Sequence, residues 1–450
     1  MQIAILGAGK TGAYIAKVLS ERQHDVTLID QNSRVLEQVR RESDLAILHA
    51  TGPSIKLFEE VGEGHPHLFF AATGDDATNL VACTMAKQFG FAKTVTRVKD
   101  KAYLPPARLD FGRLFAIDHF IHAESLAARD LFNAITHAGD IAAEYFAHGA
   151  IQMRTLQIPP QWDREQMPLA KLSLPEDLIV GLIRRKQSDG EKILFPHGND
   201  HILPGDEVTV VGKAKVMHRL HEIFHVPEHR VRSVILVGGT AVVSYLADCL
   251  SQQRIAVRII ENDDKRCIEL AESLPQATII HRDGRDPQLL KAERVQDADA
   301  LVSCTYHDGD NLLIASLAKQ IGCPKTIALI GDPSYAPILE KSGVLPALSS
   351  RVNVANRLLS ILHEETILSI SSLGCDIAKI VEVKVSPSSP LIGTPLSALS
   401  HYLPKDLLIT VIETQGKVMI GKGSQTLSPE DTVILICHHE QIPKISQLFR

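Results

Sequence analysis

The sequence has little of what several classes of protein require. Aromatic residues make up only 5% of its 450 residues, with a single tryptophan, so the stacking platforms of single-strand nucleic-acid binders are not expected. There is no basic surplus either, because 47 Lys and Arg face 53 Asp and Glu, for a net charge of −6. Non-specific binding to nucleic acid depends on positive charge, so we expect no nucleic-acid partner.

Cysteine pairs and long apolar runs are also missing. The seven cysteines include no Cys-x-x-Cys pair, which fits neither a disulfide framework nor a zinc signature. No apolar run reaches the roughly 18 residues needed to span a bilayer, and Met1 leads into a strand-like run rather than a signal peptide. With 45% hydrophobic and 22% charged residues, the chain is expected to be cytoplasmic and globular, with about three domains by length alone.

The chain is a duplication. Residues 2–7 and 233–238 both have the pattern of a buried strand that ends in a glycine turn, and an acidic residue, Asp30 or Glu261, follows 23 residues after that glycine. A constant offset of 232 residues also relates five pairs, namely Thr73/Thr305, Asn79/Asn311, Lys87/Lys319, Gly90/Gly322 and Asp100/Asp332. Such regularity is hard to obtain by chance, and repeats of this length define the architecture.

Each half divides into two patterns. The first alternates apolar runs of strand length with helical patterns, which predicts βαβ units and a parallel sheet with helices on both faces. Its expected strands are Ile3–Leu6, Val26–Ile29, Ala46–Leu48, Leu68–Ala72, Thr94–Val98 and Leu114–Ile117. The second pattern has strands separated by Pro, Gly and Asp turns, which predicts a small α+β module.

The predicted fold class is therefore α/β, with two tandem Rossmann-like, doubly wound parallel sheets, each followed by a small α+β module. The sheets are expected over residues 1–123 and 231–350, and the modules over 138–225 and 368–450. Hinge helices at about 124–137 and 351–365 are expected to join each sheet to its module.

A glycine-rich loop carries the chemistry of the first half. Gly7-Ala8-Gly9-Lys10-Thr11-Gly12 fits G-x-G-x-x-G between a strand and an amphipathic helix. The first glycine permits the tight turn, the second lets a pyrophosphate approach the backbone, and the third lets the helix pack on the strand. The helix N-terminus then presents N–H groups to the phosphates. We expect these six residues to bind a nucleotide.

Further positions at neighbouring strand ends support that site. Asp30 ends the second strand, where a carboxylate can accept hydrogen bonds from ribose hydroxyls and would repel a 2′-phosphate, so NAD(H) or an adenine nucleotide is favoured over NADP(H). Thr73, Gly74 and Asp75 end the fourth strand, at the edge where such sheets bind ligands. Arg97 ends the next strand and could face the phosphates, with a surface salt bridge as the alternative.

The second half keeps Gly238 and Glu261 as candidate nucleotide contacts but loses much of the loop. Thr240 replaces the glycine that allows phosphate approach, Val243 replaces the packing glycine, and Leu329 stands where the first half has its arginine. The second nucleotide site is therefore expected to be weak or lost.

Taken together, these features resemble the TrkA family of Trk-type potassium uptake regulatory proteins, and the resemblance covers nearly the whole chain. It rests on Gly7, Gly9, Gly12, Asp30, Ala72–Asp75, Asn79, Arg97 and the duplicated plan, with Pro204–Val208 and Pro429–Val433 in the modules. The resemblance implies two halves, each a nucleotide-binding RCK-N domain followed by an RCK-C domain. The family often has Gly-Asp after the third strand, where this chain has His49-Ala50 and His281-Arg282.

The resemblance also implies a role. A member of this family is a peripheral protein on the inner face of the plasma membrane, and it docks on a potassium-translocating membrane subunit of the TrkH or TrkG type. It gates that subunit according to bound NAD(H) or ATP/ADP. A homo-oligomeric ring is expected as well, because duplicated halves and closed symmetry avoid open filaments.

The alternative is an NAD-dependent oxidoreductase with tandem Rossmann domains. A dehydrogenase needs a substrate domain and a proton-transfer group beside the nicotinamide. The small modules are short for a substrate domain, and no Ser/His/Asp, His-Glu-x-x-His or kinase-type set is present. We therefore expect no catalytic residues and no enzyme activity.

Histidines gather near the junction of the halves. His218, His221, His225 and His229 follow one another at helical spacing. That spacing matches no zinc pattern, so a solvated helix end is favoured over a metal site.

Overall fold

The computed structural model describes the chain apart from residues 44, 64–65, 105–108, 137–139, 147–150, 188–189, 218, 227–230, 345–346, 363–366, 373–377, 405 and 415–416. The chain forms two compact units, each built from two separate stretches. The first combines Met1–Phe132 with Arg232–Leu358, and the second combines Asn133–Val231 with Leu359–Arg450. Each unit therefore takes the corresponding piece of both halves.

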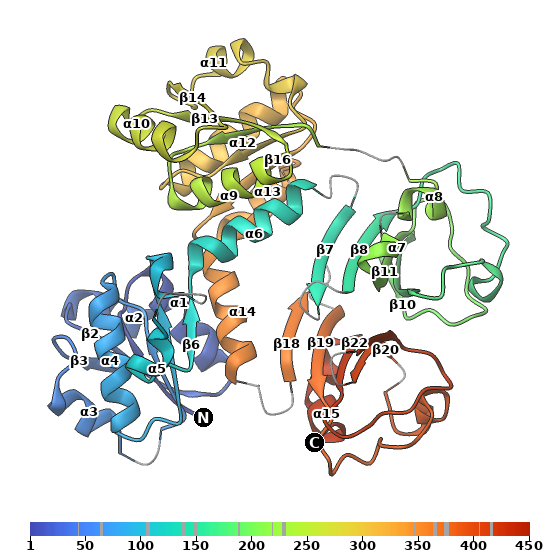
Figure 1. Cartoon of the computed structure of the whole chain (residues 1–450), viewed down its shortest axis with the longest axis horizontal. Helices are drawn as coiled ribbons and strands as arrows, with labels where there is room; N and C mark the ends of the chain where they lie inside the picture. The colour runs from blue at the N-terminus through green and yellow to red at the C-terminus, as the bar shows by residue number, and fades with distance from the viewer. Residues whose placement is uncertain are drawn as a thin grey trace. The chain divides into compact units, whose positions relative to one another are not determined.

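The first stretch of unit 1 is a six-stranded parallel sheet with the order β3-β2-β1-β4-β5-β6. Its strands are β1 (Gln2–Leu6), β2 (Asp25–Asp30), β3 (Ala46–His49), β4 (Leu68–Ala71), β5 (Lys93–Arg97) and β6 (His119–Ile121). Helices α1 (Lys10–Glu21), α2 (Ser33–Glu42), α3 (Ile55–Val61), α4 (Asp76–Gln88) and α5 (Phe111–Phe115) pack around the sheet, drawn in blue to cyan in Figure 1. The strand order reverses between β1 and β4, which is where open α/β sheets bind ligands.

The second stretch of unit 1 repeats this topology, with the order β14-β13-β12-β15-β16-β17. Its strands are β12 (Ser233–Val237), β13 (Ala256–Glu261), β14 (Thr278–His281), β15 (Ala300–Ser303), β16 (Thr326–Ile330) and β17 (Ala347–Ser349). Its helices are α9 (Ala241–Gln252), α10 (Asp264–Ser273), α11 (Pro287–Ala292), α12 (Asp308–Ile321) and α13 (Ala336–Lys341). The predicted duplication of a doubly wound sheet is confirmed.

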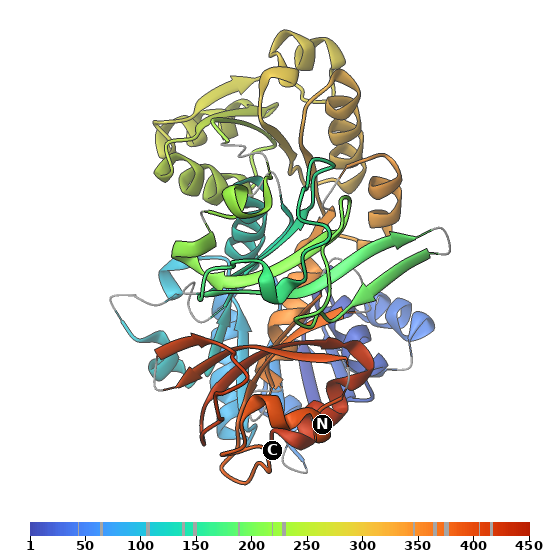
Figure 2. The ribbon, with the colours of Figure 1, turned by 90° about the vertical axis from the view of Figure 1, so that its right-hand side faces the viewer.

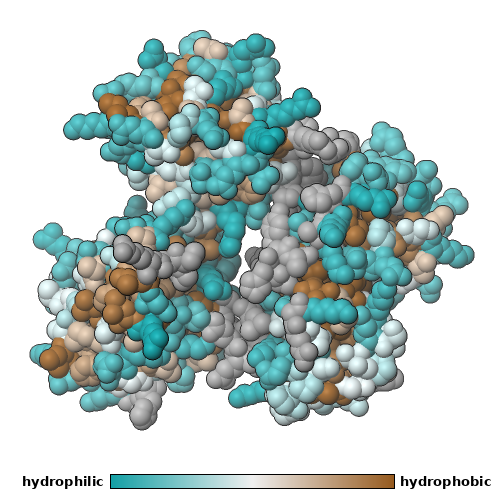
Figure 3. All heavy atoms as spheres, in the orientation of Figure 1, coloured by the Kyte–Doolittle hydropathy of each residue, from teal (hydrophilic) through white to brown (hydrophobic). Residues whose placement is uncertain are grey.

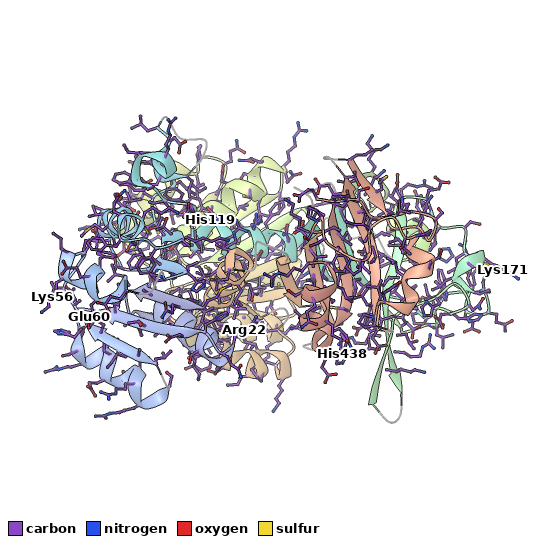
Figure 4. All side chains as sticks on the ribbon, turned by 90° about the horizontal axis from the view of Figure 1, so that it is seen from below. Arg22, Lys56, Glu60, His119, Lys171 and His438 are labelled. Carbon is purple, nitrogen blue, oxygen red and sulfur yellow. The ribbon has the colours of Figure 1, made fainter. Side chains whose placement is uncertain are left out.

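Helix α3 shows why these segments are helical. Leu57 and Phe58 are buried on one side, and the Phe58 ring lies 5.3 Å from that of Phe69 in β4. Lys56 and Glu60, labelled in Figure 4, are exposed on the other side. This division of apolar and charged residues at helical spacing is what stabilises a surface helix on a sheet.

The two sequence-distant domains of unit 1 meet through matching tyrosines. Tyr245 of α9 stacks edge-on against His122, with ring centroids 5.2 Å apart, and Lys101 Nζ lies 3.5 Å from its ring centroid. The equivalent Tyr14 of α1 lies near Asp332 and Arg351, and burial raises its pKa. The same tyrosine position therefore lies near the opposite domain in both halves, as a pseudo-two-fold arrangement requires.

Unit 2 contains two antiparallel sheets with the orders β10-β9-β11-β8-β7 and β18-β19-β22-β20-β21. The first comprises β7 (Asp140–Phe146), β8 (Ile151–Gln157), β9 (Leu178–Gln187), β10 (Gly190–Leu194) and β11 (Glu207–Lys213), with α7 (Ala214–Met217) and α8 (Leu220–Phe224). The second comprises β18 (Ile367–Ser372), β19 (Ala378–Lys384), β20 (Leu407–Thr414), β21 (Lys417–Ile420) and β22 (Thr432–His438), with α15 (Ile442–Leu448). The β9–β10 hairpin extends beyond its sheet in Figure 2.

The two modules of unit 2 share one apolar core. It joins Ile151, Met153, Leu182 and Val211 of the first sheet to Ile380, Val411, Ile434 and Ile436 of the second. Burying apolar area in this way is the main driving force for association of the two sheets.

Helices α6 (Ala123–Thr136) and α14 (Ser350–Leu362) leave the parallel sheets and lead into the modules, where the sequence predicts the hinge helices. The boundary between the compact units falls inside both helices, after Phe132 and after Leu358. Among the described residues, no helix has both the length and the apolar character to cross a bilayer. Figure 3 shows hydrophilic side chains over most of the visible face of both units.

One expected strand is wrong, and two strands of the structure were not expected. The strand expected at Leu114–Ile117 is wrong, because the Asp110 carboxylate accepts the Arg113 N–H at 3.0 Å and caps helix α5 there. The sixth strand lies at His119–Ile121 instead. The edge strands β7 and β18 were not expected from the sequence, although both pair with a neighbouring strand in the structure.

Candidate nucleotide-binding site

The glycine loop of the first half lies between β1 and α1, with each glycine in different surroundings. Gly7 has φ +109°, and a Cβ there would lie 2.9 Å from the backbone of Ala72 and Thr73. A Cβ on Gly12 would overlap the carbonyl oxygen of Gly7, whereas a Cβ on Gly9 would have no heavy atom within 4 Å. The first and third glycines therefore permit close packing, and the second leaves open space in front of the loop.

The N-terminus of α1 is open as well. Gly9 is its N-cap residue and supplies no side-chain hydrogen bond. Gly9 and Lys10 are exposed, and Thr11 is half-buried. The free N–H groups and the positive end of the helix dipole thus face the open space, which is the arrangement that binds phosphate.

Asp30 is held against this loop. Its Oδ2 accepts the Ala8 N–H at 2.6 Å, and its Oδ1 accepts the Asn32 N–H at 2.8 Å. A carboxylate has about four lone-pair sites, so both oxygens keep capacity for ribose hydroxyls. The acid and the loop, far apart in sequence, are therefore brought together as the sequence predicts.

Thr73, Gly74 and Asp75 follow β4, and their polar groups mainly support the local structure. The fully buried Asn79 accepts hydrogen bonds from the Thr73 N–H and hydroxyl at 3.0 and 2.6 Å and donates to the Arg97 carbonyl at 3.0 Å. Asp75 caps α4, because its Oδ2 accepts hydrogen bonds from the Thr78 hydroxyl at 2.5 Å and from the Thr78 N–H at 2.7 Å. These two hydrogen bonds hold the pKa of Asp75 below its usual value. Gly74 contributes a carbonyl, which accepts from Lys99 Nζ at 2.6 Å.

Arg97 makes an ion pair, which is the alternative to a phosphate contact. Its Nη2 lies 3.0 Å from Oε1 of Glu124, in the first turn of α6. Glu124 was not singled out from the sequence, because nothing in its spacing shows that β5 and the start of α6 converge. Its position directly after the last strand is the one available signal.

The second-half loop keeps the positive φ of its first glycine, but the N-terminus of the following helix is capped differently. Gly238 has φ +114°, like its counterpart Gly7. Thr240 donates its hydroxyl hydrogen to the Cys304 carbonyl at 3.1 Å and accepts the Val243 N–H at 3.4 Å. The N-terminus of α9 is therefore capped by its own threonine, whereas that of α1 is open.

A cavity of about 480 Å³ nevertheless remains at this edge of the second sheet. Glu261 lines it, with Oε1 accepting the Asn262 and Asp263 N–H groups at 2.7 and 2.8 Å. Three arginines line it as well: Arg266, Arg282 and Arg285.

All three arginines already make contacts, and Arg282 donates to the His281 carbonyl at 2.9 Å. Arg266 donates to the Gly239 carbonyl at 2.5 Å, and Arg285 pairs with Asp283 at 2.8 Å and with Asp310 at 3.6 Å. The space is large enough for a small ligand, but its polar groups differ from those of the first half. That the second nucleotide site is weak or lost stays a prediction.

The other candidate groups serve local structure. The ring of His225 packs against Trp162 with centroids 5.7 Å apart, and His218 and His229 lie outside the described residues. Within the described part of the chain, no three His, Cys, Asp or Glu side chains are arranged to hold a metal ion. Burial raises the pKa of Cys83, Cys304 and Cys437 to about 12, so these thiols are not nucleophiles at neutral pH.

The chain matches the models of two protein families, each twice. The TrkA-N domain matches residues 3–121 and 234–350, and the TrkA-C domain matches residues 165–225 and 380–450. The TrkA-N matches cover the two parallel sheets, and the TrkA-C matches cover the greater part of the two antiparallel modules.

Curated relatives align along the whole chain. "Trk system potassium uptake protein TrkA homolog 2" from Methanosarcina mazei is 31% identical and covers 100% of both chains. "Trk system potassium uptake protein TrkA" from Haemophilus influenzae is 25% identical and covers 100% of this chain and 99% of its own.

Solved structures share the fold at low sequence identity. The crystal structure of the GsuK RCK domain has a TM-score of 0.63 at 14% identity and covers 100% of this chain and 94% of its own. The GsuK channel bound to NAD has a TM-score of 0.64 at 14% identity and covers 100% of this chain and 78% of its own. A GsuK structure bound to ADP covers 81% of this chain and 69% of its own, with a TM-score of 0.52 at 10% identity. These likenesses establish an RCK fold.

Proposed function

The chain belongs to the TrkA family, with two TrkA-N and two TrkA-C domains, and we propose that it is the nucleotide-sensing regulatory subunit of a potassium uptake system. One observation carries the proposal most strongly. In the first half, an open helix N-terminus behind Gly9 lies next to Asp30, whose Oδ2 is 2.6 Å from the Ala8 N. Phosphates and a ribose would bind on adjacent groups of this single edge.

The proposed ligand is NAD(H) or ATP/ADP. The Asp30 carboxylate would repel the 2′-phosphate of NADP(H). The fold is that of a channel whose structures carry NAD and ADP, which supports a dinucleotide or an adenine nucleotide. Gly7 to Gly12 would hold the phosphates, with Thr73, Gly74 and Asp75 at the neighbouring strand end. Contacts at Gly238 and Glu261 in the second half belong to the proposal as the weaker site.

The proposed partner is a potassium-translocating membrane subunit of the TrkH or TrkG type. The support is that relatives aligned over the full chain are Trk system potassium uptake proteins. The chain would be peripheral on the inner face of the plasma membrane, and nucleotide state would gate the partner without catalysis. Coupling free energies between two such sites are usually about 1–3 kcal/mol.

A ring of several copies is part of the proposal. Val81 of α4 and Leu313 of α12 occupy equivalent positions, and their exposed fractions are 45% and 46%. Large apolar side chains left exposed at the same place in both halves favour a repeated contact between copies.

The test is calorimetric titration of the purified chain with NADH, NAD, ATP and ADP, with NADH absorbance followed in parallel. We expect saturable binding at one site per chain and constant absorbance, followed by nucleotide-dependent potassium flux when a TrkH-type subunit is added. Absence of binding would contradict the sensor. Steady NADH oxidation with an added substrate would show an enzyme instead.

A further inference from the structure

The ion pair between Arg97 and Glu124 joins the nucleotide edge to the helix that leaves the domain. Arg97 is the last residue of β5, and Glu124 lies in the first turn of α6. Nη2 and Oε1 are 3.0 Å apart, and the side chains are 20% and 21% exposed. A pair so far withdrawn from water is not an ordinary surface salt bridge, because solvent screens it little.

Each side chain of this ion pair keeps one buried polar atom without a hydrogen bond in the part of the chain that the structure describes. Arg97 Nε and Glu124 Oε2 are buried and have no hydrogen-bond partner among the described residues. The His122 ring does not supply one, because its Nε2 lies 3.9 Å from Oε2 and only 2.9 Å from the Lys99 carbonyl, while its Nδ1 accepts the Ser125 N–H. Buried charged groups with unmade hydrogen bonds are costly, so a ligand that satisfies Arg97 better can replace Glu124.

Arg97 also ends a strand at the same edge of the sheet as the glycine loop. Asn79 ties the Arg97 carbonyl to Thr73 at the end of β4, and the backbone of Thr73 packs directly against Gly7 of the loop. An anion held on the N-terminus of α1 and the Glu124 carboxylate therefore lie at one edge of the sheet and can compete for a single guanidinium group.

The second half lacks this arrangement. In β16, Leu329 pairs in register with Leu348 of β17, just as Arg97 pairs with Ile121 of β6. Three residues beyond those partners stand Arg351 and Glu124, respectively. Both members of the pair are thus changed, and the first half alone combines an open loop with an arginine tied to its exit helix.

We propose that Glu124 is a positioning residue that couples the nucleotide site to α6. Polyphosphate bound on the first-half loop accepts hydrogen bonds from Arg97 and breaks the ion pair between Arg97 and Glu124. The first turn of α6 then loses its tie to the end of β5. The coupling rests on the proposed function. Helix α6 continues past Phe132 into the second compact unit, so a change in its first turn would act on a helix that both units share.

The test is a double-mutant cycle on the full-length chain, titrated with NADH and ATP. Glu124→Gln removes the competing charge and should tighten binding about three- to tenfold, as expected when a charge-assisted hydrogen bond becomes neutral. Arg97→Leu, the residue of the second half, should weaken binding about tenfold or more. The double variant should match Arg97→Leu, because Glu124 acts only through Arg97.

Hydrogen–deuterium exchange of the α6 amides provides a readout that a purely structural role would not move. In the wild type, nucleotide should increase exchange in α6, and in Glu124→Gln exchange should already be high and respond little. The matched control is Glu293→Gln, which breaks an ion pair with Arg258 of similar length and burial in the second domain. It should change neither affinity nor α6 exchange.

The outcomes separate the two proposals. A wild type that binds none of these nucleotides overturns the proposed function, and the coupling with it. A wild type that binds, while Glu124→Gln has the same affinity and the same exchange response, overturns the coupling alone.

Discussion

Gly9 and Gly12 lie three residues apart in one loop, but their surroundings predict opposite behaviour. A Cβ at Gly12 would overlap the Gly7 carbonyl, and a Cβ at Gly9 would meet nothing within 4 Å. Gly12→Ala should therefore destabilise the chain by about 1–3 kcal/mol or more, because backbone must shift to make room. Gly9→Ala should leave the melting temperature unchanged and weaken NADH binding about tenfold or more, because its methyl group occupies the phosphate approach.

Calorimetric melting and titration of both variants check this contrast. Equal nucleotide affinity of Gly9→Ala and the wild type would contradict phosphate binding on the loop.

The Asp30 carboxylate is expected to contribute directly to nucleotide binding. Asp30→Ala should weaken nucleotide binding about 10- to 100-fold, since hydrogen bonds to a charged group contribute about 1.5–3 kcal/mol. Part of the loss would come from the loop, because the Ala8 N–H loses its acceptor. The matched variant Glu261→Ala, at the equivalent position of the second half, should change little. A comparable loss there in the same titration would show that the second cavity binds nucleotide as well.

At the scale of elements, α6 and α14 are the informative pair. Each lies where the sequence predicts a hinge helix, yet their contact places an acid in an unfavourable environment. Asp130 of α6 is largely withdrawn from water near Arg129 and near Asn353 of α14, and burial raises the pKa of Asp130 to about 6. An ordinary aspartate titrates near 3.9.

This shift predicts a pH dependence with a definite sign. The folded chain binds the Asp130 proton more tightly than the unfolded chain, so stability should rise as pH falls from about 7 to about 4, by on the order of 2 kcal/mol. Asp130→Asn should be more stable than the wild type at pH 7.5 and lack this contribution. Urea unfolding at pH 5 and pH 7.5 measures both, with Glu59→Gln on the exposed face of α3 as control. Parallel pH profiles of the wild type and Asp130→Asn would contradict the assignment.

At the scale of the whole molecule, like domains pair with like. The parallel sheets of both halves form one unit and the antiparallel modules form the other. The module of the first half buries Ile151, Met153, Leu182 and Val211 against the second module. A single half would therefore leave that apolar face without a partner.

A chain of residues 1–231 should thus self-associate into a dimer that imitates the duplicated protein. Light scattering on a sizing column measures its mass. The same fragment with Leu182→Asp should lose the dimer, because a charge would be buried in the shared core. A well-folded, monomeric 1–231 fragment would show that the modules do not depend on each other.

The sequence by itself determined the duplication, the α/β class and the glycine loop with its acid, because strand periodicity, glycine spacing and repeat offsets are local signals. It misplaced the sixth strand, where an apolar run from Leu114 is capped into a helix by Asp110. The edge strands β7 and β18 were not predicted, because an edge strand pairs with only one neighbour and its alternation of apolar and polar residues is weaker.

Only the tertiary structure decided which pieces pair and which side chains meet. The Arg97–Glu124 ion pair, the arginines beside Glu261 and the capping of α9 by Thr240 depend on where segments distant in sequence converge. So does the division into units, since the apolar faces that carry Leu182 in one module and Ile436 in the other are buried against each other. Spacing along a chain records the period of an element, whereas burial between elements is settled by packing in three dimensions.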